Sequence, residues 1–203
     1  SVAEFGDASI FSFTPTKVIT MAEGGLVVVK DKETAEKIKL GRNNGDSFNR
    51  EEEFLGITAR LSEFSAILGL ESLKMLPKLL KKRFELVGFY KKQLAGISGI
   101  SFQEINASGS SVYKDFVILV DPEKYGNTRN SLMKELEKNK IQTKVYFDPP
   151  LHLKKVYSEF SGQNLPSTRF VSDRIMSLPF YSDMLKKDIA KVCLIIRKFQ
   201  KNL

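Results

Sequence analysis

The sequence is organised around residues 11–25, Phe-Ser-Phe-Thr-Pro-Thr-Lys-Val-Ile-Thr-Met-Ala-Glu-Gly-Gly. A short apolar run, residues 10–13, stops at the Thr-Pro-Thr turn, and a second apolar run, residues 26–29, starts after the Gly-Gly pair. This order predicts a strand-turn-strand unit with Lys17 in the connection between the two strands. Pro15 fixes its own φ and favours extended backbone in the residue before it, so Lys17 is expected in a defined place on the rim of a sheet.

The surroundings of Lys17 bear on its chemistry. Partial burial among Phe11, Phe13 and Ile19 would destabilise the ammonium form and make the amine available for Schiff-base formation. The alternative is a solvated point charge, which is the more common state of a lysine. From the residue pattern alone, the solvated lysine is the better-supported interpretation.

The residue sequence of 11–25 resembles the cofactor-lysine segment of the DegT/StrS family of sugar aminotransferases. These are pyridoxal-phosphate enzymes of the aspartate-aminotransferase fold, fold type I. The resemblance rests on Ser-Phe, Thr-Pro-Thr-Lys, the following Thr, and Glu-Gly-Gly. It implies that Lys17 binds pyridoxal 5'-phosphate covalently and that Ser12 binds the cofactor phosphate. Val18 stands where the family often has asparagine, and Ala22 where it usually has glycine. Neither position carries the covalent chemistry.

Composition is that of a globular protein with a substantial core. Of the 203 residues, 42% are hydrophobic and 28% are charged, which allows one large domain or two small ones. No apolar run approaches the roughly 18 residues that span a bilayer, and the first residues do not form a signal peptide. One cysteine, Cys193, excludes an internal disulfide, and with one histidine the sequence offers few ligands for a metal. We therefore expect a cytoplasmic protein without a metal site.

The net charge of +8 raises the question of an anionic partner. A basic face of a helix attracts the phosphates of nucleic acid or of a nucleotide-sugar. Glu71 and Glu85 interrupt the cluster, and no RNA-binding aromatic motif or helix-turn-helix pattern accompanies it. A solvated helix face is the favoured interpretation, and nucleic acid is not the expected partner. The cluster consists of Lys74, Lys78, Lys81, Lys82, Arg83, Lys91 and Lys92.

The first part of the chain predicts a short sequence of elements. Residues 8–14 and 26–30 are expected strands, and residues 31–38 an exposed helix with Asp31 as its N-cap. Residues 41–56 form a polar loop of a length that is usually functional or mobile.

Residues 60–75 have the periodicity of a helix that is apolar on two sides, so a core or a partner subunit must cover both. Pro77 is expected to end or kink this helix, and a second amphipathic helix runs to about residue 95. Gly96 and Gly99 follow, and we place the domain boundary there, with one domain at 1–95 and another at 96–203.

Residues 55–63, at the start of this helix, again resemble the family. There the corresponding segment lies at the dimer interface, and its polar residues reach the cofactor phosphate of the opposite subunit. Arg60 matches a common residue and offers a fixed fork of donors for phosphate, whereas Thr58 replaces the usual asparagine. The alternative is that Arg60 pairs with Glu63 on its own helix.

The second part predicts a small α/β unit in which a helix crosses between strands and packs on their sheet. The final helix carries an apolar stripe that includes Cys193, which is therefore expected to be an unreactive core thiol. The expected strands are 100–105, 112–120 and 141–147; the expected helix is 128–139 with Thr128 as its cap; the stripe is Ile189, Val192, Cys193, Ile196 and Phe199.

The stretch Tyr-Phe-Asp-Pro-Pro-Leu-His, residues 146–152, carries the single histidine. A lone histidine is more often structural or exposed than catalytic. The stretch resembles the family's tyrosine-Pro-Pro-Leu-His segment, which approaches the entrance where the nucleotide-sugar binds. The resemblance therefore makes Tyr146 and His152 candidate substrate residues.

Taken together, the resemblance implies an α/β fold consisting of the C-terminal part of the large cofactor-binding domain, with its interface helices, followed by the small domain. It implies transfer of an amino group from glutamate to a nucleotide-linked keto-sugar in polysaccharide or glycan precursor biosynthesis, by a homodimer with shared active sites. In the family, an earlier part of the chain carries the aromatic side chain stacked on the cofactor and the aspartate at its pyridine nitrogen. The chain alone is therefore expected to be a poor transaminase. The alternative function is a noncatalytic module for dimerisation or polyanion binding.

Overall fold

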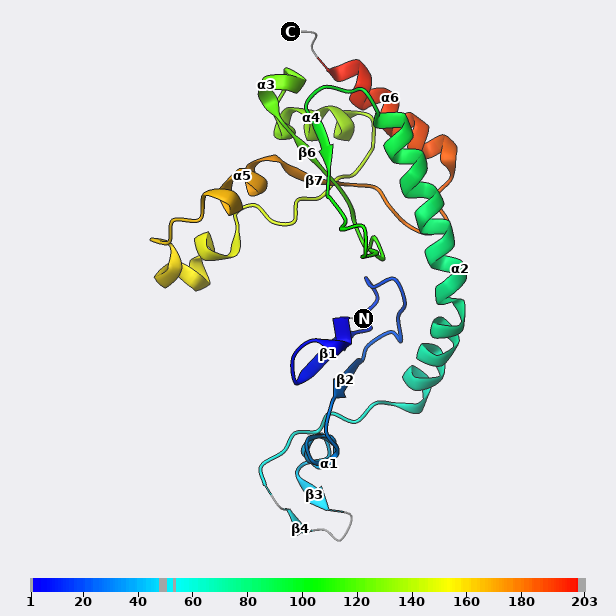
Figure 1. Ribbon diagram of the computed structural model, residues 1–203, viewed down its shortest axis with the longest axis vertical. Coiled ribbons are helices and arrows are strands. Elements are labelled where there is room, and N and C mark those ends of the chain that lie inside the picture. The colour runs from blue at the N-terminus through cyan, green and yellow to red at the C-terminus, as the bar shows by residue number, and fades with distance from the viewer. Residues whose placement is uncertain (1, 48–50, 53, 201–203) are drawn as a thin grey trace. The chain divides into compact units, whose positions relative to one another are not determined.

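The computed structural model describes residues 2–47, 51–52 and 54–200. Two compact units divide at Lys78 and Leu79 (Figure 1), inside helix α2 (Glu63–Leu94) and upstream of the predicted boundary at 95/96. The physical reason is that the second half of α2 contributes apolar side chains to the core of the second unit. These side chains are Leu86, Val87, Tyr90 and Leu94.

The first unit is built on an antiparallel hairpin. After a 3-10 turn at Val2–Glu4, strand β1 (Ala8–Ser12) pairs with β2 (Gly25–Val29), with Ala8 opposite Val29 and Ser12 opposite Gly25. The predicted strand-turn-strand unit is confirmed. Helix α1 (Lys32–Gly41) follows, and its predicted cap is confirmed because the Thr34 amide donates to Asp31 Oδ1 at 2.7 Å.

The described part of the polar loop after α1 contains regular secondary structure. It contains the two short strands β3 (Asp46–Ser47) and β4 (Glu51–Glu52), which pair antiparallel. The Ile57 amide donates to the Gly41 carbonyl at 2.8 Å, so the returning chain is tied to the end of α1.

Helix α2 is one continuous helix of 32 residues, and Pro77 lies inside it instead of ending it. A proline inside a helix costs about 3 kcal/mol, because it removes one backbone hydrogen bond and crowds the preceding turn. Burial of four apolar side chains further along α2 offsets this cost.

The second unit contains a three-stranded antiparallel sheet with the order β5-β6-β7. Its strands are β5 (Ile100–Phe102), β6 (Phe116–Val120) and β7 (Ile175–Leu178). Phe116, Ile118 and Val120 of β6 are buried, while the alternate residues are half-buried, so one face of the sheet bounds the core.

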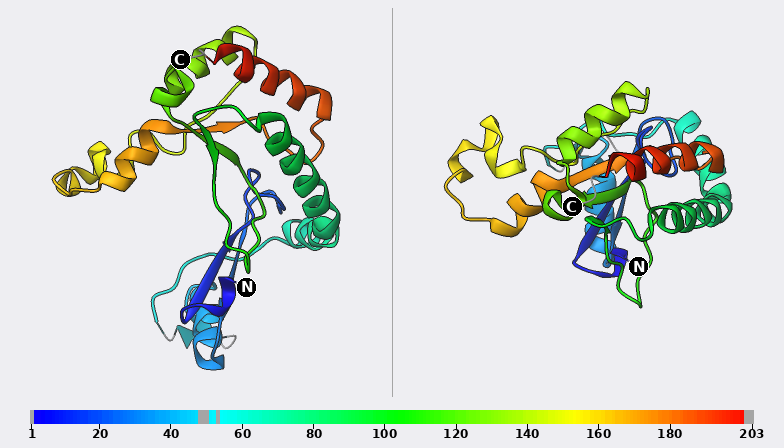
Figure 2. Two further views of the ribbon diagram at one scale, coloured as in Figure 1. Left: turned by 45° about the horizontal axis from the view of Figure 1, so that its top comes forward. Right: turned by 90° about the horizontal axis from the view of Figure 1, so that it is seen from above.

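Helices close this core. Helix α3 (Pro122–Tyr125) leads to α4 (Arg129–Lys138), which lies beside α6 (Lys186–Phe199) (Figure 2). The Thr128 cap of α4 is confirmed by the Ser131 amide, which donates to its hydroxyl at 3.2 Å. The stripe on α6 is confirmed too: Ile189, Val192, Cys193 and Ile196 are buried.

All three predicted strands of residues 100–147 are shorter than the sequence pattern indicates, and the first of them, 100–105, is a strand only over Ile100–Phe102. Residues 112–115 precede β6, because the buried guanidinium of Arg83 binds the carbonyls of Val112, Tyr113 and Lys114. Residues 141–147 form only one isolated bridge, between Lys144 and Ser177. The chain then forms the 3-10 turns η2 (Leu151–Leu153) and η3 (Lys155–Phe160) and helix α5 (Pro166–Arg174).

Within the described residues, no helix is both long enough and apolar enough to cross a bilayer, and no group of three or more potential His, Cys, Asp or Glu metal ligands occurs.

Candidate active site

The lysine lies in the loop that joins β1 to β2. At the base of the loop, the Phe13 amide donates to the Gly24 carbonyl at 3.0 Å, and the Met21 amide donates to the Phe13 carbonyl at 3.0 Å. The Lys17 amide donates to the Thr14 carbonyl at 3.0 Å, which forms a turn directly before the lysine. These hydrogen bonds give Lys17 a defined backbone position, as expected from the fixed φ of Pro15.

Thr20 ties this loop to α2. Its hydroxyl donates to the Phe13 carbonyl at 3.0 Å and accepts the Ala22 amide at 3.1 Å, while its carbonyl accepts the Ser72 hydroxyl at 2.7 Å. Ala22 has a φ of 65°, a left-handed conformation that glycine adopts more readily. This conformation gives a physical reason for the glycine that the resembling family usually has there.

Met21 fills the space between the loop and α2. It is buried, and a Cβ added at Gly24 would lie 2.3 Å from its sulfur, while one added at Gly69 of α2 would lie 2.9 Å from its Cε. A side chain at Gly24 would therefore have to displace the side chain of Met21. The first glycine of Glu-Gly-Gly has a packing role here.

Ser12 and Lys17 belong to the same short segment and differ in exposure. Lys17 is half-buried, and within the described part of the chain it makes no ion pair. Ser12 is exposed at the end of β1, and its hydroxyl contacts the Thr14 hydroxyl at 3.4 Å. An unpaired amine and an accessible hydroxyl are thus five residues apart on one hydrogen-bonded loop.

Arg60 is exposed and lies in the segment without regular secondary structure before α2, which begins at Glu63. The helical pairing of Arg60 with Glu63 is therefore wrong, and the two described side chains form no ion pair. Leu61 lies close to Gly24, since a Cβ added there would meet Leu61 Cδ1 at 3.0 Å. Arg60 is thus one residue from the segment that packs on the lysine loop.

Tyr146 and His152 lie in the second unit. His152 is buried, and its Nε2 has no hydrogen-bond partner among the described residues, so the loop does not present this side chain to solvent. Tyr146 is half-buried, with Lys114 Nζ 5.4 Å from the centre of its ring.

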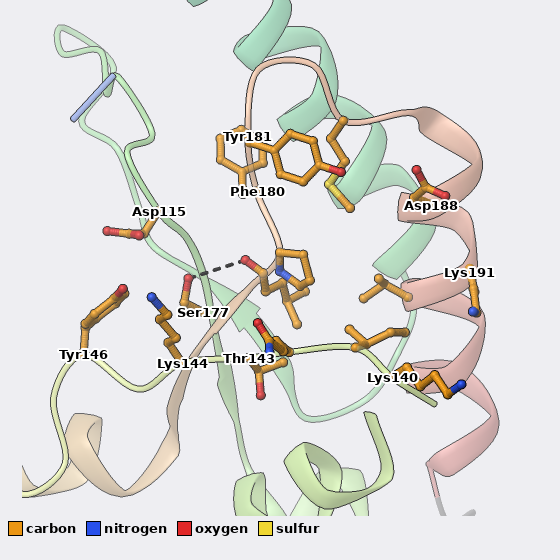
Figure 3. Close-up of a pocket in the computed structure, with 16 residues that line it drawn as sticks. Asp115, Lys140, Thr143, Lys144, Tyr146, Ser177, Phe180, Tyr181, Asp188 and Lys191 are labelled. Carbon is orange, nitrogen blue, oxygen red and sulfur yellow. Dashed lines mark hydrogen bonds between the residues drawn. The ribbon is translucent and has the colours of Figure 1, made fainter. Parts of the chain in front are cut away.

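Tyr146 also lines a pocket of about 530 Å³ inside the second unit (Figure 3). Figure 3 shows Asp115, Lys144 and Tyr146 at one end of the pocket and Lys140 and Lys191 at the other. Sequence reasoning missed this pocket, because its walls come from segments far apart in the chain. The one available signal was the mixture of lysines and apolar residues at 140–146.

The sequence model of the DegT/DnrJ/EryC1/StrS aminotransferase family matches residues 1–197. The chain belongs to this family. The family resemblance that the lysine segment indicates is thereby confirmed, and the match extends over nearly the whole chain.

Two relatives share this similarity in sequence. A UDP-N-acetyl-3-dehydro-alpha-D-glucosamine 3-aminotransferase from Acidithiobacillus ferrooxidans is 27% identical, over 97% of this chain and 52% of its own length. The spore coat polysaccharide biosynthesis protein SpsC from Bacillus subtilis is 30% identical, over 98% of this chain and 55% of its own.

Two solved structures share the fold. The pseudaminic acid biosynthesis aminotransferase PseC from Helicobacter pylori has a TM-score of 0.86 at 28% identity, over 97% of this chain and 54% of its own. DesI, solved with its TDP-sugar product, has a TM-score of 0.85 at 29% identity, over 95% of this chain and 49% of its own. The predicted α/β fold of a sugar aminotransferase is confirmed, and the chain spans about half the length of these relatives.

Enzymes of this family depend on pyridoxal phosphate. The residues of the lysine loop fit that cofactor in their chemistry. Lys17 supplies an amine without an ion-pair partner in the described residues, and the exposed Ser12 hydroxyl can donate to a phosphate oxygen.

Proposed function

We propose that this chain is the C-terminal part of a pyridoxal-phosphate-dependent aminotransferase that transfers an amino group from glutamate to a nucleotide-linked keto-sugar.

 The observation that carries the proposal is the loop of residues 13–24, which holds Lys17 half-buried between β1 and β2. Two relatives support the substrate class: one is named for a UDP-linked keto-sugar, and DesI was solved with a TDP-sugar product. The proposed product enters polysaccharide or glycan precursor biosynthesis, as the name of SpsC indicates for that relative.

In this proposal, bound pyridoxal phosphate supplies a reactive carbonyl carbon and an electron sink. With that group bound, Lys17 Nζ would act as the base that takes a proton from the α-carbon of the amino donor, and then as the acid that gives the proton up. The Ser12 hydroxyl would donate a hydrogen bond to the cofactor phosphate, and Arg60 would hold the phosphate that is bound by a second copy of the chain. Tyr146 and His152 lie on the side of the keto-sugar. The domains at 1–95 and 96–203 correspond to the end of the large domain and to the small domain.

The test is reductive trapping. The chain is mixed with pyridoxal phosphate and reduced with borohydride, and the modified peptides are mapped. We expect one pyridoxyl adduct, on Lys17, which is lost in Lys17→Ala and retained in the matched control Lys30→Ala, a lysine that directly follows β2. Adducts spread over many lysines, or an adduct pattern unchanged by Lys17→Ala, would contradict the proposal.

The second candidate function is a noncatalytic pairing module, which the exposed apolar side chains on the first half of α2 favour. The polyanion-binding version has less support. Arg83 of the basic cluster is buried, and Lys74 and Lys82 form ion pairs with Glu71 and Asp183. Binding of the chain to unrelated nucleic acid that weakens steeply with salt would support that version, and no binding at low salt would remove it.

A further inference from the structure

The segment of residues 144–148 is attached to the rest of the second unit at three successive points. At the first point, Lys144 and Ser177 exchange two backbone hydrogen bonds, of 3.2 and 2.7 Å. At the second point, the buried Ser172 hydroxyl donates to the Phe147 carbonyl at 2.7 Å. Tyr146 lies between these two points, so its backbone has little freedom to move.

The third point is an ion pair with Arg129, the first residue of α4, which is only 4% exposed. Its Nη2 donates to Asp148 Oδ2 at 2.6 Å, while Nη1 donates to the carbonyls of Ser172 and Ile175 at 2.8 and 3.2 Å. The guanidinium therefore joins α4, the end of α5 and the 144–148 segment. Asp148 is the one carboxylate paired with Arg129 among the described residues.

The two members of this ion pair differ in what their loss would do. Removal of the buried Arg129 side chain would leave the carbonyls of Ser172 and Ile175 without this donor and would destabilise the folded state. The side chain of Asp148 is 39% exposed, so its charge can be removed while the packing stays intact. Asp148 is therefore the position at which the role of the pair can be tested.

The pair has a direct consequence for the pocket. Tyr146 lines the pocket (Figure 3), whereas Arg129 and Asp148 do not. A small displacement of a positioning side chain weakens binding even when that side chain remains present. We propose that Arg129 and Asp148 are positioning residues, which hold Tyr146 in the wall of the pocket and thereby set the affinity for the keto-sugar acceptor. This inference rests on the proposed function, in which Tyr146 lies on the acceptor side.

The first measurement is amide hydrogen exchange of peptides covering residues 141–152 in the chain itself, which needs no cofactor or substrate. We compare Asp148→Asn with Asp173→Asn, a control carboxylate on α5 that is exposed. We expect Asp148→Asn to speed exchange in this segment about tenfold, because the hydrogen bond from Arg129 loses the negative charge of its acceptor, and Asp173→Asn to leave it unchanged. Unchanged exchange in Asp148→Asn would overturn the inference.

The second measurement is steady-state kinetics of the full-length enzyme that the proposed function requires. Asp148→Asn should raise the KM for the keto-sugar acceptor about tenfold, with the KM for the amino donor unchanged, and Asp148→Glu should restore part of the loss. Faster exchange together with an unchanged acceptor KM would show a merely structural ion pair and would overturn the positioning role. A wild-type enzyme without aminotransferase activity would instead overturn the proposed function, and the acceptor role with it, while the exchange result would still show whether the ion pair holds the segment.

Discussion

Cys193 is a thiol whose position in the core changes its acidity. It is 2% exposed on α6, and burial raises its pKa from 9.0 to about 12, with Arg197 acting weakly in the opposite direction. A thiol that stays protonated is a poor nucleophile. The sequence-based expectation of an unreactive core cysteine therefore agrees with its surroundings.

This shift predicts how stability depends on pH. Between about pH 9 and 12, Cys193 is ionised in the unfolded chain and protonated in the folded one, so the unfolded state binds fewer protons. The free energy of unfolding should therefore fall as pH rises, by up to about 1.4 kcal/mol per pH unit from this thiol. Urea unfolding from pH 8 to 10.5 measures the fall, which should be shallower in Cys193→Ala. Parallel curves for the two proteins would contradict the assignment.

Gly56 lies where the surrounding backbone leaves no room for a side chain. A Cβ there would lie 2.2 Å from the Gly45 nitrogen and 2.6 Å from the Gly41 oxygen, and all its close neighbours are backbone atoms. We expect Gly56→Ala to lower the free energy of unfolding by about 1–3 kcal/mol, because the backbone must shift. Gly162→Ala is the matched control, since nothing lies within 4 Å of its Cβ. Equal urea midpoints for the two variants would contradict this prediction.

At the scale of elements, Arg83 determines where strand β6 begins. The guanidinium binds three successive carbonyls before Phe116 and the Ser182 hydroxyl, the last at 3.0 Å. Burial lowers the pKa of Arg83 and Asp115 opposes this, yet a guanidinium remains charged at neutral pH. Because these carbonyls accept hydrogen bonds from the Arg83 side chain, they are not available to a neighbouring strand. The strand pairing of β6 therefore starts at Phe116.

Arg83→Met should therefore destabilise the second unit by about 3 kcal/mol or more, because several carbonyls lose their donors. The neighbouring Lys82 is the control. It forms an ion pair with Asp183 at 2.7 Å in which both side chains are exposed, so Lys82→Met should cost less than about 1 kcal/mol. Thermal unfolding followed by circular dichroism compares the two variants. A loss in Arg83→Met no larger than that in Lys82→Met would show that the carbonyl contacts contribute little.

At the scale of the whole molecule, the first half of α2 carries several large apolar side chains that the chain leaves exposed. Large apolar side chains on it are exposed, which is unusual for a protein that acts as a monomer. The sequence predicts that a core or a partner subunit must cover both sides of this helix, and a second copy of the chain is the cover that the proposed function implies. The exposed side chains are Phe64, Ile67, Leu68, Leu70, Leu73 and Met75.

We therefore predict that the chain self-associates through α2. Sedimentation velocity should detect dimers or larger species at micromolar concentration, and Ile67→Lys combined with Leu70→Lys should shift the protein toward monomers. Leu194→Lys is the control, because Leu194 is similarly exposed, at 51%, but lies on α6. Dissociation by the control as much as by the α2 variant would indicate nonspecific association.

Features that depend on neighbouring residues were predictable from the sequence. The Asp31 and Thr128 caps and the stripe on α6 each depend on side chains within a few positions of one another, and the hairpin around Lys17 follows from two apolar runs with a turn between them. The family resemblance of the lysine loop is equally local, and it placed Lys17 and Ser12 in one segment. These features survive folding because no distant contact competes with them.

Tertiary structure determined the features that depend on distant partners. Pro77 stays inside α2 because the core of the second unit holds the helix beyond it, and residues 112–115 leave the sheet because Arg83 binds their carbonyls. In each case a contact between residues far apart in the chain outweighs the local preference, because burial and buried hydrogen bonds contribute more free energy than backbone propensity does.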